Sequence, residues 1–181
     1  ELFESGLYRE KRGLNCPSSA LDISSPSNFW RYLYFATGCE THKIKAWRAQ
    51  LAVAGELQFD ANTMAQYRRG FLSRSIDDRQ TLETMARLYH DEGYLIDPHG
   101  AVALAALLDV QPHLIADSPS LCLATAHPSK FPKVVADALQ LPVSECPPAT
   151  AHVSLQQAKL LSQRVYECEY QNILTVVKNT L

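Results

Sequence analysis

The segment around Thr125 constrains the fold of this chain more than any other. A short apolar run at residues 121–124 has the composition of a buried strand, and the Thr125 hydroxyl follows it directly. Pro128 then stands where a helix would begin, because its fixed φ angle suits the first helical turn. Ligands of open α/β sheets bind at the carboxyl ends of strands. This order of residues therefore predicts a ligand position at Thr125.

Helices are predicted for most of the remaining chain. Apolar side chains recur at helical spacing in four stretches, near residues 29–37, 43–56, 76–92 and 130–139. Asp97 followed by Pro98 predicts the start of a fifth helix, which is nearly all apolar and runs to about residue 109. Ser154 and Gln157 have the form of a capping box, which predicts a further helix in the last residues. Residues 1–20 are expected to be a loop with extended pieces, and the runs 20–24 and 121–124 have the pattern of strands.

This imbalance between helices and strands leaves two architectures open. A compact α/β domain normally alternates several strands with helices, whereas this chain offers two short strand candidates. One interpretation is a piece that adds a strand and covering helices to a sheet completed by other sequence. The other is an ordinary helical domain, and the pattern fits both.

Composition excludes several classes of protein. The net charge is −2 and the basic residues are scattered, so no nucleic-acid partner is predicted. The longest apolar run, at residues 101–108, is too short to span a bilayer, and no leader pattern opens the chain. The cysteines are odd in number and lack a Cys-x-x-Cys pair, which disfavours both disulfides and a zinc site. We therefore expect a cytoplasmic protein with reduced thiols.

Three motifs, taken in order, resemble those of threonine synthases, which are pyridoxal-phosphate enzymes. The first motif is residues 20–31, Ala-Leu-Asp-Ile-Ser-Ser-Pro-Ser-Asn-Phe-Trp-Arg. The second motif is residues 93–102, Gly-Tyr-Leu-Ile-Asp-Pro-His-Gly-Ala-Val. The third motif is residues 125–131, Thr-Ala-His-Pro-Ser-Lys-Phe, which is similar to a segment near the carboxyl end of that family. The resemblance runs from about residue 20 to residue 140, and no motif is placed beyond it.

The resemblance implies the α/β fold class, as the helix-rich carboxyl-terminal portion of a fold type II pyridoxal-phosphate enzyme with few strands and an incomplete sheet. Residues 1–140 would belong to the large cofactor-binding domain, and residues 141–181 would form a linker and a helical tail. The family's cofactor-binding lysine and glycine-rich phosphate loop lie upstream of these motifs, and this chain contains neither. We therefore expect the chain alone to be inactive, with no catalytic residue and no metal ligand of its own.

The activity that the resemblance implies belongs to the complete protein. Threonine synthases convert O-phospho-L-homoserine and water to L-threonine and phosphate, so the expected partners are this substrate and the remainder of the same polypeptide. Two alternatives stay open. One is a non-catalytic binding module derived from the same fold, and the other is a lyase of that fold with another phosphorylated amino-acid substrate.

Thr125 is the residue with the strongest predicted role. In fold type II enzymes a serine or threonine hydroxyl usually meets the pyridine nitrogen of the cofactor, so the resemblance assigns Thr125 to cofactor binding. A neutral hydroxyl does not hold that nitrogen protonated as a carboxylate would. The alternative is a threonine that caps the turn after a strand.

Four other polar residues invite a functional interpretation. His127 either lies near the cofactor or caps the helix that follows Pro128. Asp97 is predicted to be a helix N-cap, and His99 a partly buried packing residue bonded toward the site wall. A zinc site built from Asp97, His99 and His127 has no recognised ligand spacing. Lys130 has the position of a surface lysine in a first helical turn and is not expected to bind the cofactor.

Overall fold

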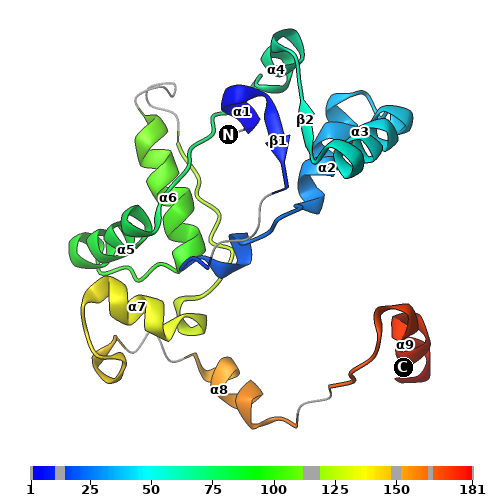
Figure 1. Ribbon diagram of the computed structural model, residues 1–181. Helices are drawn as coiled ribbons and strands as arrows, with labels where there is room; N and C mark the ends of the chain where they lie inside the picture. Colours follow the sequence, from blue (N-terminus) through cyan, green and yellow to red (C-terminus); the bar gives the residue numbers. More distant parts are fainter. Residues whose placement is uncertain (1, 11–14, 112–118, 148–151, 163–164, 181) are drawn as a thin grey trace. The chain divides into compact units, whose positions relative to one another are not determined.

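The structure is a computed structural model that describes residues 2–10, 15–111, 119–147, 152–162 and 165–180 (Figure 1). The chain divides into two compact units, Glu1–Thr150 and Ala151–Leu181. The assignment of residues 1–140 to a cofactor-binding domain stays a prediction. No helix in the described part of the chain is both long and apolar enough to cross a membrane.

The first unit is mostly helical, with one pair of short strands. In chain order its elements are α1 (Leu2–Ser5), β1 (Leu7–Arg9), η1 (Ser19–Leu21), α2 (Ser27–Ala36), α3 (Thr41–Ala54), β2 (Glu56–Gln58), α4 (Ala61–Tyr67), α5 (Asp78–Glu92), α6 (Pro98–Val110), η3 (Pro128–Lys130), α7 (Pro132–Leu139) and η4 (Val143–Glu145). Strands β1 and β2 pair antiparallel, with Tyr8 opposite Leu57. The helix-rich fold class with few strands is confirmed.

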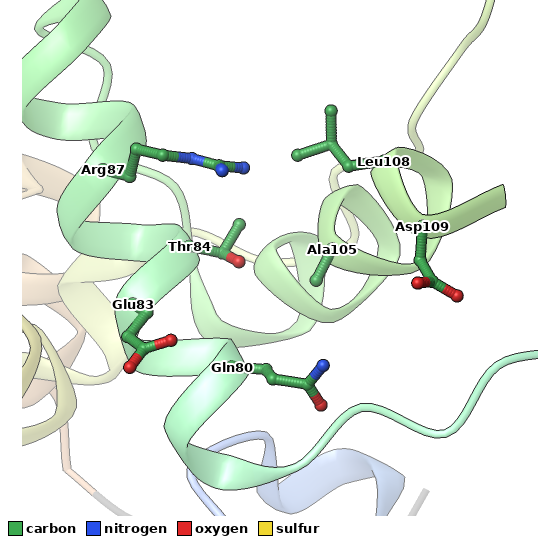
Figure 2. A pocket seen from close by; sticks show the side chains of 7 residues that line it. All are labelled: Gln80, Glu83, Thr84, Arg87, Ala105, Leu108 and Asp109. Atoms are coloured by element: carbon green, nitrogen blue, oxygen red, sulfur yellow. The ribbon is translucent and has the colours of Figure 1, made fainter. Parts of the chain in front are cut away.

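Helices α5, α6 and α7 enclose one hydrophobic cluster. Asp77 and Gln80 form a capping box at the start of α5, and Gly93 ends that helix at a φ of +66°, which a residue with a Cβ adopts only with strain. Helix α5 then packs beside α6 (Figure 2). The buried members of this cluster are Met85, Leu95, Ile96, Ala101, Val135, Ala138 and Leu139.

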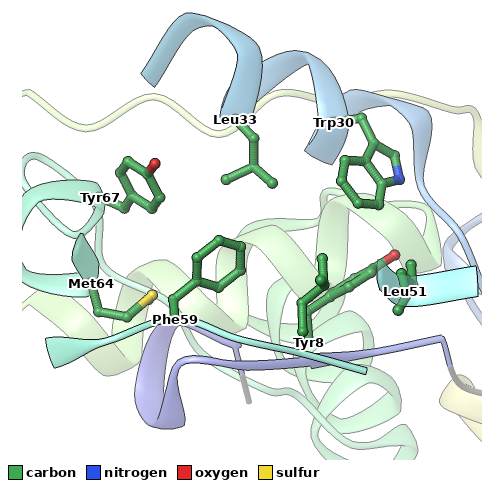
Figure 3. Close-up of a cluster of buried hydrophobic side chains, with 8 residues drawn as sticks. Tyr8, Trp30, Leu33, Leu51, Phe59, Met64 and Tyr67 are labelled. Carbon is green, nitrogen blue, oxygen red and sulfur yellow. The ribbon is translucent and has the colours of Figure 1, made fainter. Parts of the chain in front are cut away.

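The second hydrophobic cluster lies around the strand pair and is rich in aromatic rings. Helices α2, α3 and α4 contribute to it together with both strands, and Figure 3 shows its side chains pointing toward one another. The rings of Tyr8 and Phe29 stack with their centroids 4.6 Å apart, and Trp47 meets Phe59 edge to face at 5.2 Å. The buried members are Tyr8, Trp30, Leu33, Leu51, Leu57, Phe59, Met64 and Tyr67.

The second unit contains short helices that leave apolar side chains exposed. Its elements are α8 (Val153–Leu160), η6 (Tyr170–Asn172) and α9 (Ile173–Thr180). Leu160 is 86% exposed and Leu174 is 74% exposed. The predicted capping box is wrong, because His152 is the N-cap residue of α8 and Ser154 lies inside the helix. The predicted helix in the last residues is confirmed as two separate helices.

The five other predicted helices are confirmed as α2, α3, α5, α6 and α7. Both strand predictions are wrong. Residues 121–124 form no strand, and Leu121 is 87% exposed, because no neighbouring strand exists for them in the part of the chain that is described. The run 20–24 begins in η1, where the backbone N–H of Leu21 donates to the Ser18 carbonyl and closes a turn. In the described part of residues 1–20, β1 is one of the expected extended pieces, whereas the helix α1 was not expected.

Candidate functional site

The amino end of α6 carries a buried pair of polar side chains. Asp97 is only 1% exposed, and its Oδ1 accepts a hydrogen bond from the backbone N–H of His99 at 2.9 Å. The same oxygen lies 3.0 Å from Nδ1 of the His99 ring. Pro98 occupies the first helical turn, where it loses no hydrogen bond. The prediction that Asp97 is the N-cap of α6 is confirmed.

His99 connects the second motif with both of the others. Its Nε2 accepts a hydrogen bond from the backbone N–H of Ala20, in the first motif, at 3.1 Å. Its ring centroid lies 5.0 Å from that of Phe131, in the third motif. The prediction that His99 is a packing residue is confirmed, and the residue is more deeply buried than expected, at 7% exposed. The three motifs therefore meet at one side chain.

The turn that presents the Ala20 amide is closed by its own side chains. Oδ2 of Asp22 accepts a hydrogen bond from the backbone N–H of Cys16 at 3.0 Å, and the Cys16 thiol lies 3.2 Å from the Ser18 hydroxyl. Burial is the main cause that raises the pKa of the Cys16 thiol. Residues 16–22, called the 16–22 turn below, thus form a compact element with a largely protonated thiol.

The third motif is held by His127. Its Nδ1 accepts from the backbone N–H of Ser129 at 3.2 Å and lies 2.7 Å from the Ser129 hydroxyl, so His127 caps η3. Of the two roles predicted for His127, the capping role is confirmed. Lys130 ends η3 with an exposed side chain, as expected of a surface lysine.

Thr125 stands at the start of the third motif with its side chain exposed. No hydrogen bond to Thr125 is found among the described residues, and the following turn is capped by His127 instead. The Thr125 hydroxyl is thus available to a partner outside the described residues. Its predicted contact with the cofactor stays a prediction.

A pocket of about 440 Å³ lies beside Thr125, between the second and third motifs. Its wall includes Tyr89 and Tyr94 at the end of α5, the buried Asp97, and the chain on both sides of Thr125 through Ala124 and Ala126. No sequence pattern predicts this pocket, because Tyr89 and Ala124 are distant in the sequence and meet only in the folded chain. It is the described cavity closest in sequence to the predicted cofactor residue.

A separate groove of about 420 Å³ lies between α5 and α6, away from the three motifs (Figure 2). Glu83 and Arg87 of α5 face Leu108 and Asp109 of α6 across it. Asp109 forms an ion pair with Arg74 at its rim. The charged groups that line the groove are of both signs, with Glu83 and Asp109 acidic and Arg87 basic.

The alternative zinc site is not assembled. Within the described ranges, no group of three or more His, Cys, Asp or Glu side chains could hold a metal ion. Asp97 and His99 are bonded to each other, and His127 is bonded to Ser129.

Comparison with known proteins relates the chain to one family. A family model described as the carboxyl-terminal part of threonine synthase matches residues 100–178, which extends the resemblance into the last 40 residues. Threonine synthase of Pseudomonas aeruginosa is 31% identical over 137 residues, which cover 76% of this chain and 28% of that protein. Threonine synthase of Schizosaccharomyces pombe is 32% identical over 129 residues, covering 65% of this chain and 25% of that protein.

Solved structures of the same family share the fold. A pyridoxal-phosphate-bound threonine synthase from Brucella melitensis superposes with a TM-score of 0.69 at 28% identity, over 76% of this chain and 29% of that one. Threonine synthase from yeast gives a TM-score of 0.78 at 22% identity, over 98% of this chain and 38% of that one. The chain thus spans less than half the length of each relative. It is homologous to the carboxyl-terminal region of threonine synthases.

Proposed function

We propose that this chain is part of a threonine synthase-like lyase that converts O-phospho-L-homoserine and water to L-threonine and phosphate. The meeting of the three motifs at His99 carries the proposal, because Ala20, which lies 79 residues before His99, and Phe131 of the third motif both contact the His99 ring. The homology to threonine synthases supports the same reaction. The substrate and the remainder of the polypeptide are the proposed partners.

The residues of this chain fit one end of pyridoxal phosphate. The exposed Thr125 hydroxyl is a neutral hydrogen-bonding group, which suits the pyridine nitrogen of the cofactor. Its neighbours Ala124 and Ala126 line the pocket, whereas Thr125 itself is not part of the pocket wall. Pyridoxal phosphate, when bound, supplies an electron sink for elimination and replacement at the β and γ carbons of an amino acid. A hydroxyl leaves the ring nitrogen less protonated than a carboxylate would, and so moderates that sink.

The other end of the cofactor requires residues from outside this chain. We propose that the lysine that binds the cofactor covalently and the loop that binds its phosphate are supplied by the rest of the polypeptide. This chain contributes the Thr125 hydroxyl, the adjoining wall through Tyr94 and Asp97, and covering helices. By this proposal the chain has no turnover alone.

The test compares the complete polypeptide with the isolated 181-residue chain. We expect the complete polypeptide to release phosphate from O-phospho-L-homoserine and to form L-threonine in equal amounts when pyridoxal phosphate is present. The isolated chain should do neither. After borohydride reduction with pyridoxal phosphate, mass spectrometry should find no lysine of the isolated chain labelled stoichiometrically. A single stoichiometric label, for example at Lys130, would overturn the division of roles, and absence of threonine formation would overturn the reaction.

A lyase with another phosphorylated amino-acid substrate is the second candidate. It differs from the first candidate at residues that the proposal above places outside this chain, so the assay distinguishes the two candidates. In the same assay, phosphate release from a different phosphorylated amino acid, with none from O-phospho-L-homoserine, would support this candidate over the first.

A further inference from the structure

The protons around His99 can be placed from the chemistry of its neighbours. The backbone N–H of Ala20 can only donate, so Nε2 of His99, at 3.1 Å, must present a lone pair. The Asp97 carboxylate can only accept when ionised, so Nδ1, at 3.0 Å, must carry the proton. Both contacts are satisfied together by one state alone, the neutral ring with its proton on Nδ1.

The other two states of the ring conflict with the same neighbours. A proton on Nε2 would point at the N–H of Ala20, and an unprotonated Nδ1 would turn its lone pair toward the Asp97 oxygen. The His99 and Asp97 side chains are only 5% and 1% exposed, so water is not at hand to replace a lost partner. A polar atom left unpaired at such a site lowers stability more than the same loss at the surface.

The same ring also contacts the segment that leads to the predicted cofactor residue. Phe131 packs on His99 with centroids 5.0 Å apart, and the backbone N–H of Phe131 donates to the Pro128 carbonyl. Through η3, which His127 caps, this contact reaches the chain that begins at Thr125. The position of the third motif is therefore connected to the first motif through His99.

We propose that His99 is a positioning residue, which as the neutral Nδ1–H tautomer binds the 16–22 turn to the amino end of α6 and sets the position of the third motif. The Asp97 carboxylate favours this tautomer because it accepts a hydrogen bond from Nδ1–H. The Ala20 amide then donates to the lone pair on Nε2. The effect on turnover rests on the proposed function, because it acts through Thr125. The tautomer and the hydrogen bond to the Ala20 amide do not rest on the proposed function, and both can be measured in a protein that has no activity.

Two substitutions separate the ring nitrogens. A glutamine side chain is long enough to place its carbonyl oxygen near Nε2, so His99→Gln retains an acceptor for the Ala20 amide. His99→Phe retains a ring against Phe131 and removes both hydrogen bonds. Packing alone would be kept by His99→Phe, whereas the proposed contact would be kept only by His99→Gln. The pair thus distinguishes positioning from filling of space.

The experiment measures the tautomer in the full 181-residue chain and the hydrogen exchange of one amide. Long-range proton–nitrogen NMR spectra of the imidazole should show Nδ1 protonated and Nε2 unprotonated for His99. Exchange of the Ala20 amide should accelerate about tenfold in His99→Phe, the effect of losing about 1.4 kcal/mol, and by much less in His99→Gln. The Phe59 amide, bonded to the Gly6 carbonyl, is the control and should not change in either variant.

Three results would overturn the proposal. These are an Nε2–H tautomer, a charged ring at neutral pH, and an unchanged Ala20 exchange rate in His99→Phe. If His99→Phe does not fold, the tautomer of His99 measured in the unmodified chain still supports or refutes the proposal. In the complete enzyme, turnover should be lower in His99→Phe than in His99→Gln at equal folded concentration. A correct tautomer without threonine formation would refute the proposed function alone.

Discussion

Replacement of Asp97 by alanine removes two interactions at one buried position. The first is the N-cap of α6, whose loss costs about 1 kcal/mol, within a range of about 0.5–2. The second is the acceptor for Nδ1–H of His99, and a buried donor left unpaired costs about 1–3 kcal/mol. Together they predict that Asp97→Ala lowers the free energy of unfolding by about 3 kcal/mol.

Asp77→Ala is the control, because Asp77 is the N-cap residue of α5 and its side chain accepts a hydrogen bond from the backbone N–H of Gln80, with no histidine involved. We expect that variant to lose about 1 kcal/mol. Urea unfolding followed by far-ultraviolet circular dichroism measures both. Asp97→Asn should fall between them, since an asparagine oxygen still accepts both hydrogen bonds without the charge. Equal losses for Asp97→Ala and Asp77→Ala would refute the claim that Asp97 acts on His99 as well as on the helix.

Two further predictions concern the rest of the first unit. Leu33 is 1% exposed inside the aromatic cluster (Figure 3), so Leu33→Ala should lower the free energy of unfolding in urea by about 2–5 kcal/mol. Phe35, on the same helix, is 66% exposed, so Phe35→Ala should lower it by less than about 0.5 kcal/mol, and similar losses for the two variants would contradict the packing. Because burial raises the pKa of the Cys16 thiol, mass spectrometry should find it alkylated by iodoacetamide more slowly than the exposed Cys39 and Cys168, and faster labelling of Cys16 would contradict its burial.

The helices that carry strong terminal signals were predictable from the sequence. Asp97 followed by Pro98 marks the start of α6, and the structure confirms both the boundary and the capping role. Gly93 likewise marks the end of α5. These signals are local, since the cap and the first turn lie within a few residues of each other. Short-range interactions therefore allow most of the helices to be predicted from the sequence.

The strands were not predictable because their partners are distant or absent. Strands β1 and β2 have three residues each, and α2 and α3 lie between Tyr8 and its partner Leu57 in the sequence. In contrast, the run 121–124 has a strand-like composition but no partner strand among the described residues. Composition alone cannot supply the neighbour that a strand requires.

The hydrogen bond between Ala20 and His99, which joins two motifs of the candidate site, could not be predicted from the sequence either. The motifs singled out His99 and the residues around Ala20 separately, but Ala20 contributes a backbone N–H, which has no side-chain signature. Their separation of 79 residues left no local pattern to connect them. The resemblance identified the three motifs of the candidate site, and the packing of the helices determines where these motifs meet.

The proposed contact between the Thr125 hydroxyl and the cofactor is tested most directly by the turnover of the complete protein with Thr125 substituted. Thr125→Val keeps nearly the same shape and removes the hydroxyl, which contributes about 0.5–1.5 kcal/mol as a hydrogen bond and about 1–3 if its partner is left unpaired. Because about 1.4 kcal/mol is a factor of ten, we predict a roughly ten- to hundredfold fall in turnover per folded, cofactor-loaded molecule, with Thr125→Ser close to the unmodified protein. Unchanged turnover in Thr125→Val, accompanied only by a lower melting temperature, would contradict the account.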